Sequence, residues 1–373
     1  MVNVGSIIQH ALHPHGHSST HHATMDHKPT TAHPTRASHT RRWISKMSSA
    51  YTKAQTLEWL SFIGYKVTDE VKEQVETDTF PANLENLNVI SRLYLVAVPF
   101  ENTTLQYDPA HELNIEPQYL FQRFVKEKKG SCCFGKSGLL FEMLRSLGFR
   151  VYGGQARVNN TDFTPGATAE KPAFTPPLHI ITFVQPNVDN TDTYLLDVGF
   201  GGTGLVRPIL LEEGADVFGC TQTEKHRLVR RPFPGRTSAQ DPPEDMWALD
   251  ILRVQPGKSE KWSNVYMFDE VEHYKEDYIH ANFYVAKFPF GTPFYGYVVL
   301  IKNFFVDKDH EDLGTLLLFG DQVRRNVGSN SEVLRNLKTE KERIAAIKEF
   351  FGIELDATEA LNSIKGRASA LPM

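Results

Sequence analysis

Two adjacent cysteines, Cys132 and Cys133, follow a glycine-containing turn and precede an apolar stripe at residues 139, 140, 143, 144 and 147. The stripe predicts a helix that begins near Cys133 and is closed by Gly148. A thiol at a helix start meets unpaired backbone N–H groups and the positive end of the helix dipole, which favour the thiolate, and Lys129 adds positive charge. The alternative is a small apolar residue filling the start of a buried helix, and this feature alone prefers neither interpretation.

A histidine and an aspartate lie in two strand-like segments further along the chain. His179 opens His-Ile-Ile-Thr-Phe-Val, and Asp197 lies near the end of Tyr-Leu-Leu-Asp-Val. Each is nine residues from Val188, which lies in the polar loop between the segments, so a hairpin would place the two side chains opposite each other. The apolar neighbours of Asp197 predict a buried carboxylate, which needs a partner. The alternative is a turn aspartate before Gly199 and a solvent-exposed histidine, but a Cys–His–Asp set is favoured over three coincidences.

Such a set predicts nucleophilic catalysis. The Asp197 carboxylate would orient His179, and His179 would take the proton of Cys133. The thiolate would then attack a thioester or amide carbonyl, with backbone N–H groups at the helix start as oxyanion donors. Water as the second nucleophile gives a hydrolase and an amine gives an acyltransferase, and the three residues alone do not choose between them.

The elements that must position these groups change along the chain. Apolar residues recur at close to helical spacing in the first part of the folded sequence, at residues 57–63, 84–96 and 119–126. Short segments rich in β-branched and aromatic residues follow and are predicted strands: 150–158, 179–184, 194–198, 265–267, 283–286 and 296–302. Thr339 and Glu342 form a capping-box pair before a terminal helix that stops at Gly352. This order predicts an α+β fold and not an alternating parallel sheet.

The first 49 residues differ in composition from the rest. They hold nine of the fifteen histidines and little apolar material, which predicts disorder. A transit peptide and a transition-metal-binding segment are alternative interpretations. A dispensable tail, or an over-extended gene start with Met47 as the true initiator, is favoured over both.

The composition narrows the class of protein. The formal net charge of −5 gives no electrostatic reason to expect nucleic acid or an anionic membrane as partner. No apolar run approaches the roughly 20 residues of a membrane-spanning helix. Three cysteines, two of them adjacent, are too few for a disulfide framework and indicate a reducing compartment, so a cytoplasmic location is expected.

Several motifs together resemble the arylamine N-acetyltransferase family, most of all its fungal branch. The family pattern Arg-Gly-Gly-x-Cys-x-Glu-x-Asn corresponds to Lys-Gly-Ser-Cys-Cys-Phe-Gly-Lys-Ser at residues 129–137. Val-Pro-Phe-Glu-Asn precedes it at 98–102, and Leu-His-Ile at 178–180 and Leu-Asp-Val-Gly-Phe-Gly-Gly at 196–202 match the histidine and aspartate strands. The resemblance covers about residues 50–361, and the last string after a histidine strand is the most specific signal.

The resemblance implies a helical bundle, a β-barrel and an α/β lid. The corresponding division is a disordered tail at 1–49, a helical domain carrying the nucleophile at 50–147, a β-barrel domain at 148–255, and an α/β lid domain with a terminal helix at 256–373. It also implies ping-pong transfer from acetyl-CoA or another acyl-CoA, with malonyl-CoA preferred by some fungal relatives. The acceptor would be an arylamine, arylhydroxylamine or hydrazine, and no metal is implied. By the same resemblance Cys133, His179 and Asp197 are the catalytic residues, and Tyr284 and Thr292 contact coenzyme A.

The departures from the family pattern are concentrated at the nucleophile. Lys129 lacks the planar fork of arginine, and Ser131 replaces a glycine, which matters if the position needs a positive φ. Gly135 and Ser137 replace glutamate and asparagine. These changes are expected to loosen the helix start that presents Cys133. A thiol hydrolase or transglutaminase-like enzyme, and a coenzyme A-binding relative with weakened chemistry, are the alternative functions.

Overall fold

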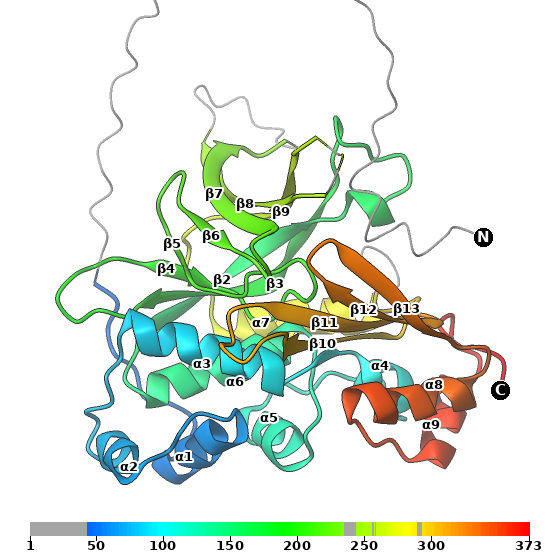
Figure 1. Ribbon diagram of the computed structural model, residues 1–373, viewed down its shortest axis with the longest axis horizontal. Coiled ribbons are helices and arrows are strands. Elements are labelled where there is room, and N and C mark those ends of the chain that lie inside the picture. The colour runs from blue at the N-terminus through cyan, green and yellow to red at the C-terminus, as the bar shows by residue number, and fades with distance from the viewer. Residues whose placement is uncertain (1–42, 235–243, 256, 258, 289–292) are drawn as a thin grey trace, which may run out of the picture. The chain divides into compact units, whose positions relative to one another are not determined.

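The computed structural model describes residues 43–234, 244–255, 257, 259–288 and 293–373. Within these ranges Trp43–Met373 form one unit. It combines helices with two antiparallel sheets, and most of the helices lie below the sheets in the view of Figure 1. The predicted α+β class is confirmed.

The N-terminal region is helical because its polar caps and apolar stripes agree. Thr52 caps the first helix with a complete capping box, and Asn83 caps the third through the N–H of Asn86. Their apolar faces bury Trp59, Leu87 and other side chains in one core. The helices are α1 (Lys53–Phe62), α2 (Asp69–Glu76), α3 (Leu84–Ala97), α4 (Thr103–Tyr107), α5 (Pro117–Phe121), the π-helical turn η3 (Gln122–Lys126) and α6 (Cys133–Ser146).

The larger sheet has eight strands in the order β5-β4-β3-β2-β9-β8-β7-β6. Its outer strands β5 and β6 approach each other, so the sheet is a nearly closed barrel. Its core is apolar and aromatic, with Phe183, Leu249 and Tyr266 fully buried. The strands are β2 (Arg150–Asn159), β3 (Phe174–Gln185), β4 (Tyr194–Leu196), β5 (Ile209–Leu210), β6 (Asp216–Phe218), β7 (Glu224–Pro232), β8 (Asp245–Arg253) and β9 (Trp262–Phe268).

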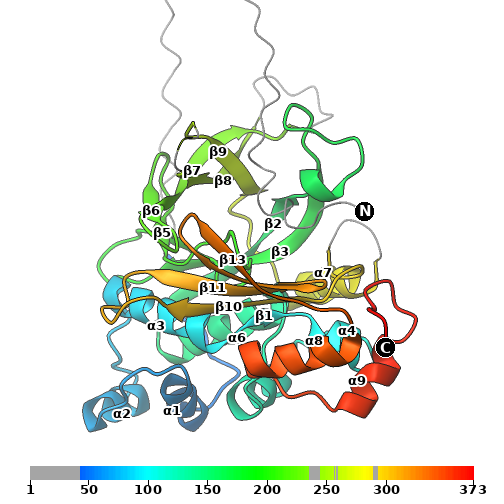
Figure 2. The same ribbon diagram turned by 45° about the vertical axis from the view of Figure 1, so that its right-hand side comes forward.

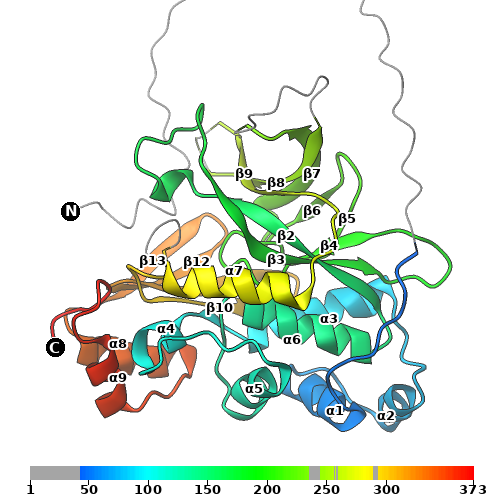
Figure 3. The same cartoon turned by 180° about the vertical axis from the view of Figure 1, so that it is seen from behind.

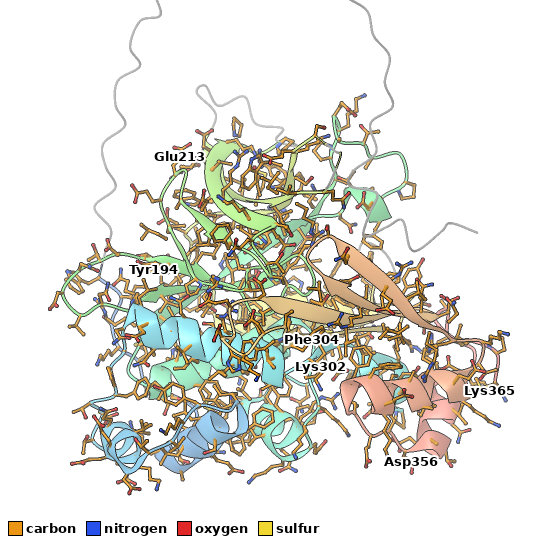
Figure 4. All side chains as sticks on the ribbon, viewed as in Figure 1. Tyr194, Glu213, Lys302, Phe304, Asp356 and Lys365 are labelled. Atoms are coloured by element: carbon orange, nitrogen blue, oxygen red, sulfur yellow. The ribbon has the colours of Figure 1, made fainter. Side chains whose placement is uncertain are left out.

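The smaller sheet has five strands in the order β1-β10-β11-β12-β13. Figures 1 and 2 both show it between the barrel and the C-terminal helices. In Figure 4 the side chains of Lys302 and Phe304 mark β10, which packs beside α3, and Asp356 and Lys365 mark the two ends of α9. The elements are β1 (Phe100–Glu101), β10 (Val299–Phe305), β11 (Leu313–Phe319), β12 (Gln322–Val327), β13 (Asn330–Asn336), α8 (Glu340–Ala346), the π-helical turn η5 (Ile347–Phe351) and α9 (Ala357–Ile364).

Strand β1 comes from the N-terminal region and pairs with β10. It therefore connects the segment before Cys133 to the smaller sheet.

One predicted strand, residues 283–286, is wrong. These residues belong to helix α7 (Lys275–Lys287). The aromatic and β-branched composition imitates a strand, but the buried side chains Ala281, Asn282 and Val285 recur at helical spacing. Figure 3 shows α7 lying across β3 and beside α6, and contacts of α7 with β3 support this.

Two other predictions agree with the structure only in part. The barrel sheet continues past the predicted boundary at residue 255, because β9 pairs with both β8 and β2. Of the predicted capping box, Thr339 accepts from the N–H of Glu342, whereas the Glu342 carboxylate accepts from the N–H of Lys338. Gly352 ends the α8–η5 helix in the left-handed conformation, with φ of 74°, as predicted, but this helix is not the last one, because α9 follows it.

Most of the predicted disordered tail lies outside the described residues. Its last part, residues 43–49, has no regular secondary structure but lies against the folded unit. The N–H of Ile44 donates to Gln185, and the Ser49 hydroxyl donates to the Glu142 carbonyl oxygen. Among the described residues, no helix is long and apolar enough to cross a membrane.

Candidate active site

Cys133 is the first residue of α6, as predicted, and Cys132 is the N-cap. The thiol-bearing residue is 5% exposed, so it lies just beneath the surface. A parallel bridge between Phe100 and Ser131 fixes the preceding turn. A Cβ at Gly130 would overlap the carbonyl oxygen of Pro99, so this position needs glycine for close backbone approach.

The neighbouring cysteine has a different environment. Cys132 is fully buried, and its Sγ lies 3.5 Å from the carbonyl oxygen of Glu101, to which it donates. Burial, followed by the nearby charges of Cys133 and Glu101, raises the pKa of the Cys132 thiol well above its ordinary value. Cys132 is therefore a protonated structural thiol, and Cys133 is the nucleophile candidate.

His179 and Asp197 are in contact. The imidazole Nε2 lies 2.7 Å from Asp197 Oδ2, and both residues are at most 3% exposed. The second carboxylate oxygen, Oδ1, accepts from the N–H of Gly199 at 3.0 Å. Asp197 is thus both a turn residue and the histidine's partner, and the alternative of a solvent-exposed His179 is wrong.

The predicted strand register is wrong by two residues. β3 and β4 pair Thr182 with Leu196 and Val184 with Tyr194, so His179 does not face Asp197 directly. Asp197 instead follows the end of β4. A shift of two residues keeps the same face of the sheet, so the side chains meet as diagonal neighbours.

The imidazole links the carboxylate to the thiol. Burial lowers the pKa of His179, but the charge and hydrogen bond of Asp197, and then a hydrogen bond and charge from Cys133, outweigh it and raise the pKa to about 10. Because Nε2 is held by Asp197, the other ring nitrogen, Nδ1, is the one available to the thiol. The structure therefore brings together the three residues predicted from the sequence.

Aromatic rings surround this imidazole. Phe200 meets it edge-on with ring centroids 5.1 Å apart, and the Tyr266 ring lies 5.5 Å away. Tyr266 is fully buried, and burial followed by the charge of Asp197 raises the pKa of its phenol. These rings exclude water from the His179–Asp197 pair and strengthen its electrostatic interaction.

The glycine-rich loop after Asp197 packs directly against Cys133. A Cβ at Gly199 would lie 3.1 Å from the Cα and carbonyl oxygen of Cys133 and would overlap the Ser137 hydroxyl. Barrel side chains hold the loop from the other side, because His226 Nε2 donates to the Thr203 carbonyl oxygen at 3.0 Å. Small residues in this loop therefore allow the barrel and α6 to meet at the site.

The altered residues of the nucleophile motif fit one another. A Cβ at Gly135 would lie 2.5 Å from Ser131 Oγ and 2.7 Å from Ser131 Cβ. The Ser131 side chain, present where the family pattern has glycine, thus occupies the space beside Gly135, where the pattern has glutamate. Ser131 does not have a positive φ. The expectation that these substitutions loosen the helix start is not supported at this pair. The Lys129 ammonium pairs with Glu127 at 3.3 Å.

A buried lysine lies on α6 one turn after Cys133. Lys136 is 1% exposed, and its Nζ donates to the Val98 carbonyl oxygen at 2.6 Å. Burial lowers the pKa of Lys136 to about 7, although the Asp197 carboxylate opposes this. Sequence reasoning missed this residue, since an isolated lysine within a helix usually faces solvent.

Of the two residues predicted to contact coenzyme A, the structure describes Tyr284 but not Thr292. Tyr284 is half-buried on α7, where its ring stacks on Phe288 with centroids 4.5 Å apart. Its described contacts do not include Cys133, His179 or Asp197. Thr292 lies outside the described residues. Among the described residues, no group of three or more histidine, cysteine and acidic side chains could hold a metal ion.

Similarity to known proteins identifies the family of this chain. Residues 83–360 match the family model described as N-acetyltransferase. The chain belongs to the arylamine N-acetyltransferase family. It is therefore an N-acyltransferase of that family.

The relatives of this family member include fungal and bacterial enzymes. The N-malonyltransferase FDB2 of Fusarium pseudograminearum is 28% identical over 86% of this chain and 94% of its own length. The arylamine N-acetyltransferase of Escherichia coli K12 is 25% identical over 74% of this chain and 84% of its own. Two solved structures share the fold. The arylamine N-acetyltransferase of Mycobacterium abscessus has a TM-score of 0.65 at 23% identity, covering 86% of this chain and 98% of its own. That of Mycobacterium marinum in complex with CoA has a TM-score of 0.62 at 20% identity, covering 85% and 99%.

Sequence reasoning missed three side chains around the site of this N-acetyltransferase family member. Tyr266 and Lys136 are described above, and the third is Arg123, whose guanidinium lies beside the nucleophile turn. A sequence signal existed only for Tyr266, which lies in a predicted strand but carries no motif. Arg123 is ten residues before Cys133 in an ordinary amphipathic segment.

Proposed function

We propose that this enzyme transfers an acyl group from an acyl-CoA to the nitrogen of an arylamine, arylhydroxylamine or hydrazine through a thioester on Cys133. The observation that carries the proposal is the buried chain of contacts from Asp197 through His179 to Cys133. It provides an oriented base beside a thiol at a helix start, which is the arrangement that thioester chemistry requires.

In the first half-reaction, His179 takes the proton of Cys133 and the thiolate attacks the thioester carbonyl carbon. A new C–S bond forms to Cys133, and the C–S bond to coenzyme A breaks. His179 returns the proton to the leaving thiolate, and Asp197 stabilises the imidazolium throughout. Backbone N–H groups at the start of α6 stabilise the oxyanion.

In the second half-reaction, the acceptor nitrogen attacks the Cys133 thioester. His179 removes the proton from that nitrogen, the C–N bond forms, and Cys133 leaves as the thiolate. The aromatic rings of Phe200 and Tyr266 around His179 keep water away from the base, which favours transfer to the amine over hydrolysis.

The donor is proposed to be acetyl-CoA or malonyl-CoA. The relatives named N-malonyltransferase support including malonyl-CoA, and the solved relative in complex with CoA supports a coenzyme A thioester. Tyr284 and Thr292 are proposed to contact coenzyme A. The position of Tyr284 on α7, which packs on the His179 strand β3, supports its part in this assignment.

The test is release of free coenzyme A thiol from acetyl-CoA and, separately, malonyl-CoA, with and without an aniline or an arylhydrazine. The proposal predicts release that depends on the amine, with parallel double-reciprocal plots as expected for a ping-pong mechanism. Cys133→Ala is the control and should be inactive. Release at the same rate without amine would identify a hydrolase, and no release with either donor from folded protein would contradict the proposal.

A further inference from the structure

The family pattern begins with an arginine at residue 129, where this chain has lysine. The Lys129 ammonium pairs with Glu127 and is partly exposed, so it does not reach into the turn before Cys133. A guanidinium is nevertheless present there. It belongs to Arg123, whose Nε donates to the Gly130 carbonyl oxygen at 2.7 Å.

The local backbone explains how residue 123 reaches this turn. Residues Gln122–Lys126 form the π-helical turn η3, and Lys128 follows with a positive φ of 56°. The N–H of Lys129 then donates to the Arg123 carbonyl oxygen at 3.0 Å. Arg123 therefore holds the turn twice, through its carbonyl group at Lys129 and through its side chain at Gly130.

A second partner connects the same guanidinium to the strand beside the nucleophile. Arg123 Nη2 lies 2.6 Å from Glu101 Oε1 and donates to the Thr103 hydroxyl at 3.2 Å. The Glu101 side chain is fully buried, and its backbone N–H donates to the Ser131 carbonyl oxygen at 3.1 Å. Arg123 and Glu101 thus enclose residues 130 and 131, immediately before Cys132 and Cys133.

Arg123 and Glu101 are both charged, although both side chains are buried. Burial alone would raise the pKa of the Glu101 carboxyl, but the charge of Arg123, with hydrogen bonds from Thr103 and Arg123, lowers it. The pair is therefore ionised inside the protein, and removing one partner would leave the other charge buried without compensation. A turn held so firmly fixes the direction of the first N–H groups of α6.

We propose that Arg123 is a positioning residue for the nucleophile: it supplies, from the preceding helical segment, the guanidinium that the family pattern places at residue 129. Through Gly130 and Glu101 it holds the start of α6 in the geometry that stabilises negative charge at Cys133. This inference rests on the proposed function of Cys133. Its test, however, measures thiol reactivity and needs no acyl donor.

The experiment measures the second-order rate of Cys133 alkylation by iodoacetamide against pH, using full-length protein and Cys133→Ala as the blank. Arg123→Gln should raise the pH midpoint of alkylation by about one unit, which lowers the rate at pH 7 about tenfold. Arg123→Lys should lie between the two, because an ammonium cannot contact Gly130 and Glu101 with the same planar fork. Arg123→Gln/Lys129→Arg should move the midpoint back toward wild type.

Arg343→Met is the matched control for loss of a buried arginine. Arg343 lies in α8 and is fully buried. It pairs with Glu340 and donates to the Ser369 carbonyl oxygen. It should lower the melting temperature and leave the alkylation midpoint unchanged.

The proposal is overturned if folded Arg123→Gln and Arg123→Lys keep the wild-type midpoint, if Arg343→Met shifts it equally, or if Lys129→Arg gives no recovery. An unreactive wild-type enzyme toward every acyl-CoA, with the alkylation pattern above intact, would instead remove the proposed function and leave the role of Arg123 standing.

Discussion

Replacing Asp197 by asparagine should remove the charge that makes His179 a base without changing the shape of the site. The carboxylate is the main group that raises the pKa of His179 from 6.5 to about 10, against burial, which lowers it. A rise of this size corresponds to about 5 kcal/mol in favour of the imidazolium. Without the carboxylate, burial opposes the imidazolium, and His179 no longer draws the proton from Cys133. We expect acylation of Cys133 to slow by about 10³- to 10⁴-fold, the scale seen when a triad aspartate becomes asparagine.

The same substitution should change how stability depends on pH. A histidine whose pKa is raised in the folded state contributes stability that is complete below pH 6.5 and is lost as pH rises through 10, because the folded protein releases its proton last. Wild type should therefore lose up to about 5 kcal/mol of this contribution across that window. Asp197→Asn should lack this loss.

The assays are single-turnover acylation at pH 7 and thermal unfolding from pH 6 to 10. Asp250→Asn is the matched control, because Asp250 is another buried carboxylate, paired with Arg227 and Arg231 in the barrel. It should reduce stability and leave the acylation rate within a fewfold of wild type. An Asp197→Asn enzyme that acylates at the wild-type rate, with an unchanged pH dependence, would refute the reasoning.

Two further substitutions test the surroundings of the nucleophile. Gly135→Ala should destabilise the protein by about 1–3 kcal/mol because its Cβ would crowd Ser131, whereas the same change in a Ser131→Gly background should be neutral or slightly stabilising, as thermal unfolding of the four proteins would show. Equal effects in both backgrounds would mean that the two positions are independent. Lys136→Met removes an amine whose pKa falls from 10.5 to about 7 on burial, so wild-type stability should fall as pH drops from 10.5 to 7. The stability of Lys136→Met relative to wild type should then be about 3 kcal/mol higher at pH 6.5 than at pH 9.5, and a difference independent of pH would contradict a buried, titrating Lys136.

The residues proposed to carry the chemistry could be singled out from the sequence because each is tied to a local pattern. The apolar stripe and Gly148 place the start of α6 at Cys133, and Gly148 has the expected positive φ of 82°. The burial of Asp197 follows from its apolar neighbours. Its pairing with His179 survived an error in register, since an offset of two residues keeps both side chains on one face.

The register itself was not predictable. The loop at residues 186–193 is too long to be a two-residue turn, which would have fixed the pairing of β3 and β4. Residues 283–286 of α7 resemble a strand because Phe283 and Tyr284 carry strand-like composition, while the helical spacing of the buried side chains spans residues 281–285. In both cases tertiary packing decides between local alternatives.

The contacts of Arg123 and the fit between Ser131 and Gly135 depend on atoms brought together by folding. Arg123 meets Glu101, 22 residues away, through a π-helical turn that no motif announces. Because these contacts are not visible in the sequence, the four departures from the family pattern at residues 129–137 suggest a weakened site when the sequence is considered alone. The structure shows Ser131 beside Gly135 and the Arg123 guanidinium in contact with Gly130, and we propose that this guanidinium replaces the one missing at residue 129.

The central claim is that Cys133 carries the acyl group. The most direct measurement is intact-mass analysis with peptide fragmentation after brief exposure to acetyl-CoA and to malonyl-CoA, with Cys133→Ala as control. The account predicts one acyl adduct per chain, located on Cys133 and not Cys132, which an added arylamine discharges. An adduct on Cys132, an adduct that persists in Cys133→Ala, or no adduct from folded protein with either donor would contradict it.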